Sequence, residues 1–181
     1  MSGGKIRGSF ARSGGAVFKG IPFAQPPIGQ LRRREPMPVR TWASVHEAVT
    51  FAASCMQGGA DAAKSSDCLY LDIWTPKGPP AKSGTAAMVW FHGEGNFAGA
   101  ASDPIYDGER MARPGVVLVT AQYRLGVFGF FAHPDLKRES PHHSSGNYGV
   151  LDQIAALGWG RDNIAHFGGN PENLKRQMEN E

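Results

Sequence analysis

The stretch VWFHGEGNFAG, residues 89–99, gives the first indication of the fold, because glycines gather directly behind an apolar run. The run AAMVWF, residues 86–91, is continuously apolar and bounded by turn signals, which predicts a strand covered on both faces. Glycine adopts backbone angles that other residues avoid and lets the main chain approach a bound group closely. The sequence therefore predicts a central strand that ends in a loop suited to close backbone contact.

Phosphate binding is one interpretation of this loop, since GEGNFA, residues 93–98, fits the pattern G-x-G-x-x-G/A behind a predicted strand. That use requires a helix that starts at the glycines and an acidic residue at the end of the next strand. The following GAASDPIYDGER, residues 99–110, is interrupted by glycine and proline, and residues 120–122 are Thr, Ala and Gln. These features disfavour a dinucleotide site.

An oxyanion hole is a second interpretation of the loop. Some esterases use an HGGG-like turn after a central strand, whose amide N–H groups face the oxygen that becomes negative when an ester carbonyl is attacked. Residues 92–95 read His-Gly-Glu-Gly and fit this turn. A third interpretation is a tight turn that binds nothing. The loop by itself leaves the second and third interpretations open.

The surrounding segments predict a mixed α/β chain. Residues 5–20 predict a hairpin with its turn at residues 13–15, and residues 21–38 contain five prolines, which exclude regular helix. The alternation in CLYLDIW, residues 68–74, predicts a half-buried strand. The apolar run VVLVTA, residues 116–121, predicts a second central strand.

A helix is predicted over residues 148–167, with Asn147 as its N-cap and Gly168 and Gly169 as its stop. Its apolar side is expected to consist of Leu151, Ile154, Ala155 and Leu157. Strands followed by a glycine loop, another strand and a helix indicate an α/β fold.

Charge and hydropathy exclude several classes of protein. The net charge of +3 arises from 19 basic and 16 acidic residues, and the triplet Arg32–Arg34 is not interleaved with aromatic residues, so no nucleic-acid partner is predicted. No apolar stretch reaches the roughly 18 residues of a membrane span. The start MSGGKIRGSF lacks the apolar core of a secretory signal, and the compartment is left open.

The two cysteines, Cys55 and Cys68, lie thirteen positions apart without the paired histidines of a zinc site. A disulfide between them would stabilise the fold by about 3 kcal/mol in the chain-entropy model and would suit a secreted or periplasmic setting. Two unpaired thiols in a cytosolic protein are the alternative that the residues leave open. No spacing among the histidines suggests a metal site.

Five blocks resemble the type-B carboxylesterases, the family that includes the cholinesterases. They are FKGIPFAQPPIGQLRRREPMP, SSDCLYLDIWTP, VWFHGEGNFAG, VVLVTAQYRLGVFGF and GNYGVLDQIAALGWGRDNIAHFGGNPEN. They occur in the family's order and cover most of residues 14–173. The resemblance implies the N-terminal portion of an α/β-hydrolase fold, a small-molecule ester as substrate, hydrolysis through a Ser-His-Glu/Asp triad, and no cofactor.

The resemblance also implies roles for particular residues. Glu94 and Gly95 match the oxyanion-hole amides, and Cys55 and Cys68 match the family's first disulfide. The residues Arg124 and Asp152 match an internal ion pair that holds the scaffold.

This chain departs from the family pattern at the loop. Glu94 stands where the family has its middle glycine, and Asn96 stands where an aromatic residue is usual. A carboxylate would repel a developing oxyanion unless it turns outward to solvent. Ser66 replaces the acidic residue that would pair with Arg32.

A further departure follows GGNPEN, residues 168–173, where the family continues through a short strand into the nucleophile elbow G-E-S-A-G. Here Met178 lies at the position of the first elbow glycine and Asn180 at that of the serine. The chain is therefore predicted to be one incomplete domain, residues 1–181, that lacks the catalytic Ser, acid and His and is inactive alone. The alternative is a non-catalytic cholinesterase-like binding or adhesion module.

Two other expectations concern the loop SPHHSSGN, residues 140–147, and the sheet. Neighbouring serines and histidines in one loop rarely achieve triad geometry, so no second catalytic site is predicted there. A sheet that stops before its nucleophile strand would leave an apolar central strand unpaired, which predicts self-association through that edge.

Overall fold

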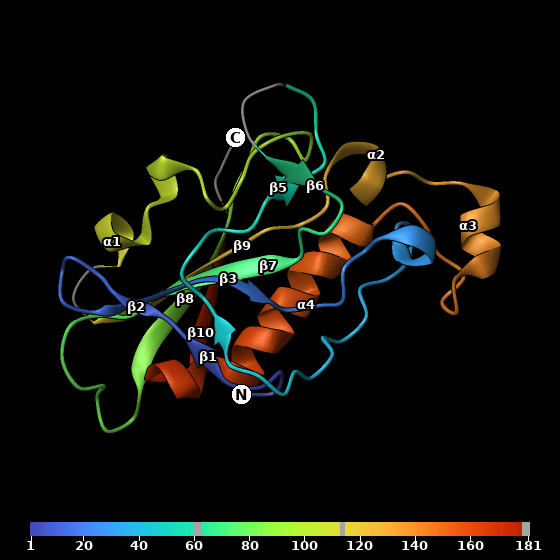
Figure 1. Ribbon diagram of the computed structural model, residues 1–181. Coiled ribbons are helices and arrows are strands. Elements are labelled where there is room, and N and C mark those ends of the chain that lie inside the picture. The colour runs from blue at the N-terminus through green and yellow to red at the C-terminus, as the bar shows by residue number, and fades with distance from the viewer. Residues whose placement is uncertain (60–62, 113–114, 179–181) are drawn as a thin grey trace.

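The computed structural model describes residues 1–59, 63–112 and 115–178, and its centre is a six-stranded sheet (Figure 1). The strand order is β10-β8-β9-β7-β3-β2. β10, β8 and β9 are parallel, whereas β7, β3 and β2 run antiparallel to their neighbours. The strands are β2 (Ser9–Phe10), β3 (Ala16–Pro22), β7 (Tyr70–Trp74), β8 (Thr85–Phe91), β9 (Val116–Ala121) and β10 (Gly169–Met178).

The two strands predicted to be central both lie inside this sheet, with a neighbour on each side. β8 lies between β10 and β9, and β9 lies between β8 and β7. β9 is buried from Val117 onward, as expected for a valine-rich strand with a neighbour on each side. The predicted α/β class and the central placement are confirmed.

β7 is more deeply buried than its alternating sequence predicts. Residues 71–74 are all buried, including Asp72 and Trp74, which the alternation placed on an exposed face. The prediction is wrong because both faces of the sheet are covered at this strand. On one face, a Cβ added to Gly108 would lie 2.1 Å from the Trp74 ring, so the chain there rests directly on the indole.

The N-terminal hairpin is confirmed, since β2 pairs with β3 through Ser9 opposite Val17 and Phe10 opposite Ala16. The proline-rich segment that follows contains one short 3₁₀ turn, η1 (Gly29–Leu31). Two small parallel ladders lie outside the main sheet. They are formed by β1 (Ile6–Arg7) with β4 (His46–Glu47), and by β5 (Ser54–Cys55) with β6 (Lys64–Ser65).

The main helix, α4 (Tyr148–Asn163), packs against β8, β9 and β10, whereas α1 (Gly108–Met111) contacts β7 and β9 (Figure 1). The two elements contact different sets of buried side chains. Val89 and Val119 belong to the core that includes α4, and Trp74 and Leu118 form a smaller cluster. The other short helices are η2 (Pro104–Tyr106), α2 (Gly126–Gly129), α3 (Pro134–Glu139) and η3 (Ile164–Phe167).

The extent of the main helix matches the prediction, because η3 continues α4 to Phe167 and Gly168 ends the run with φ +78°. Asn147 is the N-cap residue, but its side chain makes no capping hydrogen bond. The predicted apolar side is wrong at Ile154, which is 57% exposed, whereas Ala155 and Leu157 pack against the main core as predicted. Asp152 and other polar residues of the helix are buried as well. Whether a side chain of this helix is buried depends on the elements that pack against it, and the periodicity of apolar residues does not identify those elements.

β10 corrects the expectation that the sheet stops before the strand that follows GGNPEN. Leu174 lies opposite Ala87 and Met178 opposite Phe91, so this segment pairs in parallel with β8. Leu174 approaches α4, where a Cβ on Gly160 would lie 3.3 Å from its Cδ2. The apolar edge of β8 is therefore covered, and the outer strand in the described residues is the more polar β10. Self-association of the chain stays a prediction.

Among the helices that the structure describes, none combines the length and the apolar character needed to cross a membrane.

Candidate functional site

The glycine loop, residues 92–99, begins where β8 ends at Phe91. β9 is the parallel neighbour of β8 and ends at Ala121, so the loops behind both strands leave the same edge of the sheet. The two loops are joined directly, because the Gly126 N–H donates to the Asn96 carbonyl at 2.8 Å. The carboxyl ends of parallel strands are the usual ligand site of α/β sheets.

The loop has three successive residues in the left-handed region, with φ of +69° at Glu94, +58° at Gly95 and +64° at Asn96. Left-handed backbone costs a non-glycine residue roughly 1–2 kcal/mol. A hydrogen bond from the Phe97 N–H to the Glu94 carbonyl, 3.0 Å, closes the turn. Within residues 1–59, 63–112 and 115–178, the N–H groups of Glu94 and Gly95 have no acceptor. The strained turn therefore leaves two amides available to a ligand.

The base of the loop is rigid. His92 is fully buried and stacks on Tyr123, with ring centroids 4.5 Å apart, and the Tyr123 hydroxyl donates to the His92 carbonyl at 2.8 Å. Gly99 lies against the same imidazole, since a Cβ there would be 2.5 Å from Nδ1. A side chain at position 99 would therefore displace the histidine, and its φ of +103° also favours glycine.

Two hollows flank the loop. The first, about 430 Å³, is lined by Gly95, Asn96, Phe97, Gly126, Val127, Phe130, Phe131 and Ala132. Its rim is apolar, and Phe97 is 75% exposed. The second, about 310 Å³, includes Glu94 and Gly99 together with Gln57 and Lys64. Glu94 is exposed and lines the second hollow, whereas Gly95 lines the first.

This arrangement separates the carboxylate of Glu94 from the apolar hollow beside Gly95. Gly95, whose amide has no acceptor in the described residues, lines the apolar hollow, and low polarity strengthens a hydrogen bond to such an amide. The geometry suits a carbonyl oxygen that acquires negative charge.

The cysteines form a disulfide, with Cys55 and Cys68 5.0 Å apart at their Cα atoms. Both residues are buried and belong to the main core. The bridge closes the segment that lines the second hollow through Gln57 and Lys64.

Arg124 and Asp152 form a buried ion pair between the loop after β9 and helix α4. The guanidinium Nη2 lies 2.7 Å from Oδ1 of Asp152, its Nε lies 2.7 Å from Oδ2, and the Arg124 N–H also donates to Oδ2 at 3.0 Å. Desolvation raises the pKa of Asp152, and the hydrogen bonds from Arg124 oppose that rise. The remaining guanidinium nitrogen, Nη1, donates to the carbonyls of Arg32 and Arg34.

The arginine triplet is thus tied to the scaffold through its backbone. Arg34 forms an ion pair with Glu139 at 2.9 Å, and Arg33 lies over the Phe131 ring, 5.5 Å from its centroid. These contacts hold Arg33 and Arg34 within the fold.

No serine hydroxyl in the described part of the chain is hydrogen-bonded to a histidine ring. Ser140 Oγ donates to Glu35 at 2.9 Å, and the other carboxylate oxygen of Glu35 lies 3.5 Å from His142 Nε2. Among the residues that the structure describes, the Ser145 hydroxyl bonds only to the backbone of His133. The carboxylate, not the imidazole, therefore meets the serine, which is the wrong order for a triad.

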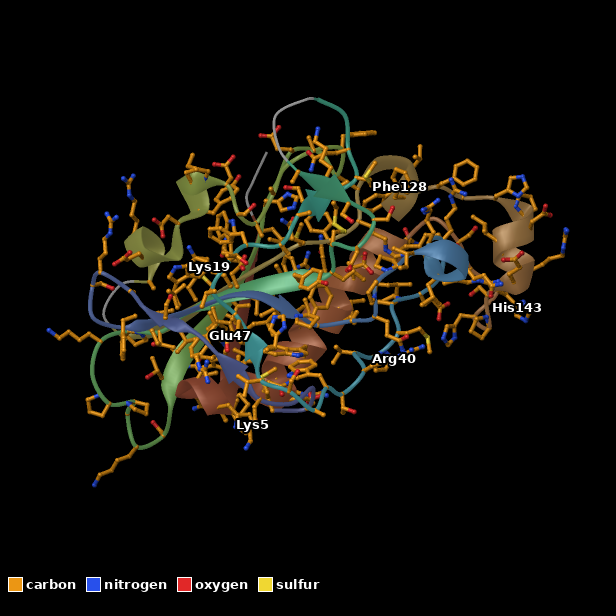
Figure 2. All side chains as sticks on the ribbon, in the orientation of Figure 1. Lys5, Lys19, Arg40, Glu47, Phe128 and His143 are labelled. Atoms are coloured by element: carbon orange, nitrogen blue, oxygen red, sulfur yellow. A yellow bond between two sulfur atoms is a disulfide. The ribbon has the colours of Figure 1, made fainter. Side chains whose placement is uncertain are left out.

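Two residues discussed in the sequence analysis do not belong to the glycine loop. His143 lies beside α3, at the end of the molecule drawn at the right of Figure 2. Asn180, the residue at the position of the expected serine, lies outside the described residues.

The sequence did not single out two polar residues that the fold makes important. Asp72 is buried between strands and accepts hydrogen bonds from the Gly20 N–H at 2.8 Å and the Thr120 hydroxyl at 3.4 Å. Desolvation raises its pKa to about 7. Its place inside the apolar run CLYLDIW was a signal for it. Gln57, whose amide binds the glycine loop, had none.

Comparisons with known proteins agree with this fold. The chain is 47% identical over 164 residues to fumonisin B1 esterase of Sphingopyxis macrogoltabida, which covers 87% of the chain and 30% of that protein. It is 43% identical over 188 residues to cocaine esterase of Oryctolagus cuniculus, covering 93% of the chain and 34% of the relative. The chain thus spans about a third of the length of these relatives.

Solved structures of α/β-hydrolase esterases superpose on the chain closely. A thermophilic PNB esterase matches with a TM-score of 0.89 at 38% identity, over 98% of this chain and 37% of its own. Carboxylesterase EST55 of Geobacillus stearothermophilus matches with a TM-score of 0.86 at 40% identity, over 96% of this chain and 35% of its own. The structure is therefore an N-terminal portion of the α/β-hydrolase fold.

A family model confirms the resemblance that the five sequence blocks suggested. The model described as the carboxylesterase family matches residues 1–175, almost the whole sequence. On this match, this chain belongs to the carboxylesterase family.

Proposed function

We propose that residues 1–181 are one incomplete carboxylesterase domain that supplies the oxyanion hole of an ester hydrolase. In the whole enzyme a serine would attack the carbonyl carbon of a carboxylic ester, and the carbonyl oxygen would become an oxyanion. The alcohol would leave with a proton, and water would then release the acid from the acyl-serine. The N–H groups of Glu94 and Gly95 would stabilise both tetrahedral intermediates.

One observation carries this proposal: two successive residues in the left-handed region, Glu94 and Gly95, have amides without an acceptor in the described residues, and Gly95 lines an apolar hollow. Loss of one oxyanion-hole donor costs an esterase or protease about 10²–10³ in kcat. A turn that only reversed the chain would gain nothing by holding Glu94 and Asn96 at positive φ. The esterase relatives and the family membership support the same role.

A chimera tests the role of the loop. Residues 1–175 would replace the matched segment of the thermophilic PNB esterase, which supplies its own remaining sequence. The chimera is expected to hydrolyse 4-nitrophenyl acetate within about 10³-fold of the parent, since the hole is remodelled rather than absent. A Glu94→Gly chimera is the matched control and is expected to be about tenfold faster, because it lacks the nearby carboxylate.

The non-catalytic binding module is the second candidate, and Glu94 in the loop favours it. It predicts that the chimera folds but turns over no faster than a parent in which the nucleophilic serine is replaced by alanine. That outcome would reject the oxyanion role.

The isolated chain provides a second test. It is expected to hydrolyse 4-nitrophenyl acetate no faster than a heat-denatured sample, because no described serine meets a histidine. Turnover blocked by one equivalent of an organophosphate would show that a serine nucleophile is present and would overturn this part of the proposal.

A further inference from the structure

Gln57 connects the disulfide-bounded segment to the glycine loop through both ends of its side-chain amide. Its Nε2 donates to the Gly99 carbonyl at 2.8 Å, and its Oε1 accepts from the Gly99 N–H at 2.8 Å. A single side chain thus satisfies both backbone groups of the last loop residue. Two such bonds fix the orientation of the Gly99 peptide groups as well as their distance from Gln57, because rotation about one bond would break the other.

The position of Gln57 is itself fixed by the disulfide. Its Nε2 also donates to the carbonyl of Cys55, 3.1 Å away, and Cys55 is held by its bond to Cys68. The strand that begins the segment is paired as well, since Ser54 and Cys55 lie opposite Lys64 and Ser65. The amide therefore joins the loop to a cross-linked anchor.

The glycine loop is hydrogen-bonded to the scaffold at both ends and, through the Asn96 carbonyl, to Gly126. At one end the Tyr123 hydroxyl holds the carbonyl of His92, and at the other end the Gln57 amide holds Gly99. The N–H groups of Glu94 and Gly95, which have no acceptor in the described residues, lie between the bonds at the two ends. Catalytic donors must be held within about 0.5 Å of the productive geometry by surrounding bonds.

We propose that Gln57 is a positioning residue for the oxyanion-hole amides and that the Cys55–Cys68 disulfide acts on the same loop through it. This proposal rests on the proposed function of the loop. It predicts that the ester-binding geometry depends on the redox state of a bridge that does not itself touch the ester.

Hydrogen–deuterium exchange of the whole chain tests the clamp without any substrate. In Gln57→Ala, peptides covering residues 92–100 are expected to exchange about tenfold faster than in the wild type, while peptides of α4 are unchanged. Gln25→Ala is the matched control, because within the described residues the side-chain amide of Gln25 bonds only to the exposed Arg40, 3.1 Å away and outside the loop. Loop exchange equal to that of the wild type would overturn the proposal.

Gln57→Glu keeps the result interpretable if the alanine variant does not fold. The carboxylate still accepts from the Gly99 N–H but cannot donate to the carbonyls of Gly99 and Cys55 when ionised. At pH 7 the protection of the loop amides is expected to lie between that of the wild type and that of Gln57→Ala. It should approach the wild-type protection as the carboxyl gains its proton near pH 4. Equal protection at both pH values would contradict a donor role for Gln57.

Removal of the bridge is the second arm of this experiment. Dithiothreitol would transfer two electrons and two protons, forming the thiols of Cys55 and Cys68 while its own thiols close to a cyclic disulfide. The reduced wild type is expected to exchange faster over residues 92–100, by about the same factor as Gln57→Ala. If reduction left the exchange of residues 92–100 unchanged, the proposed role of the disulfide would be rejected.

The chimera distinguishes failure of the clamp from failure of the proposed function. Gln57→Ala in the chimera is expected to lower kcat about tenfold with KM nearly unchanged, as for an interaction used in the transition state. Faster loop exchange with unchanged kcat would keep the clamp and reject the oxyanion role. Unchanged loop exchange would reject the clamp whatever the kinetics.

Discussion

The loops that follow β8 and β9 leave the same edge of the sheet but are built in opposite ways. The loop after β9 contains Arg124, which is buried and bonded to Asp152 through three hydrogen bonds. The loop after β8 is held at its two ends and leaves the amides of Glu94 and Gly95 without acceptors in the described residues.

This difference shows that some polar groups of the fold stabilise the structure, whereas others are left to bind a substrate. A buried charge must be paired, because an unpaired one costs several kcal/mol, so the Arg124 side is closed. An amide that is to stabilise a substrate oxygen must be left without an internal partner, so the glycine loop is open. One loop fixes the relation of sheet and helix, and the other presents its backbone.

Asp152→Ala should have the largest effect. It strands a buried guanidinium, and we expect a loss of about 3–5 kcal/mol in the free energy of unfolding, measured by urea denaturation. The double variant Arg124→Met with Asp152→Leu removes both charges and should recover most of that loss. If the free energy of unfolding fell by less than about 1 kcal/mol, the Arg124–Asp152 pair would not be the structural interaction that distinguishes the two loops.

Removing the disulfide should come next. The double variant Cys55→Ser with Cys68→Ser is expected to lose about 3 kcal/mol, because the unfolded chain regains the freedom of a short closed loop. Dithiothreitol should lower the stability of the wild type by a similar amount and leave the variant unchanged. Identical urea midpoints for oxidised and reduced wild type would contradict this prediction.

Asp72 extends the comparison to a buried carboxylate held by neutral donors. Its pKa is about 7 in the folded chain and near 3.9 when unfolded, so between these values only the native state holds the proton. The free energy of unfolding should therefore fall as pH rises, by about 2–3 kcal/mol between pH 5 and pH 7, and level off above pH 7.

Asp72→Asn is the control for that titration. The amide keeps the acceptor for the Gly20 N–H, carries no charge, and should be the more stable protein at pH 8. Urea denaturation of both proteins at several pH values measures the difference. Parallel stability curves for the two proteins would assign the pH dependence to other groups.

Glu94→Gly should have the smallest effect on stability. Glycine removes the cost of a side chain at φ +69°, roughly 1–2 kcal/mol, but increases the freedom of the unfolded chain. We expect a net gain of at most about 1 kcal/mol, measured by urea denaturation. Glu47→Gly tests the specificity of this gain, since Glu47 lies in strand β4 and should lose stability. A loss at Glu94 as well would mean that its carboxylate is a structural ligand of the loop.

Local patterns predicted the elements that carry continuous apolar runs. AAMVWF and VVLVTA became the central strands β8 and β9, and the helix beginning at Tyr148 ended at the expected glycine. These segments are defined by burial on both faces or by a stop signal, which a short window of sequence contains. The resemblance to carboxylesterases likewise depended on local blocks.

Contacts between distant parts of the chain determined strand pairing and burial where local sequence patterns gave a wrong prediction or none. The sheet was expected to stop before the strand that follows GGNPEN, yet residues 174–178 pair with β8, and Leu174 lies against α4 near Gly160. Ile154 was assigned to the buried side of the helix and is exposed. Such outcomes depend on which partners the fold brings within reach, and no window of neighbouring residues contains that information.

The sequence by itself determined the order of the elements, the glycine loop and the family, because each is encoded by neighbouring residues. Only the tertiary structure decided which polar groups are paired: Asp152 with Arg124, Gly99 with Gln57, and the amide of Glu94 with no described acceptor. The physical reason is that the free energy of a polar group depends on its burial and on partners from distant parts of the chain.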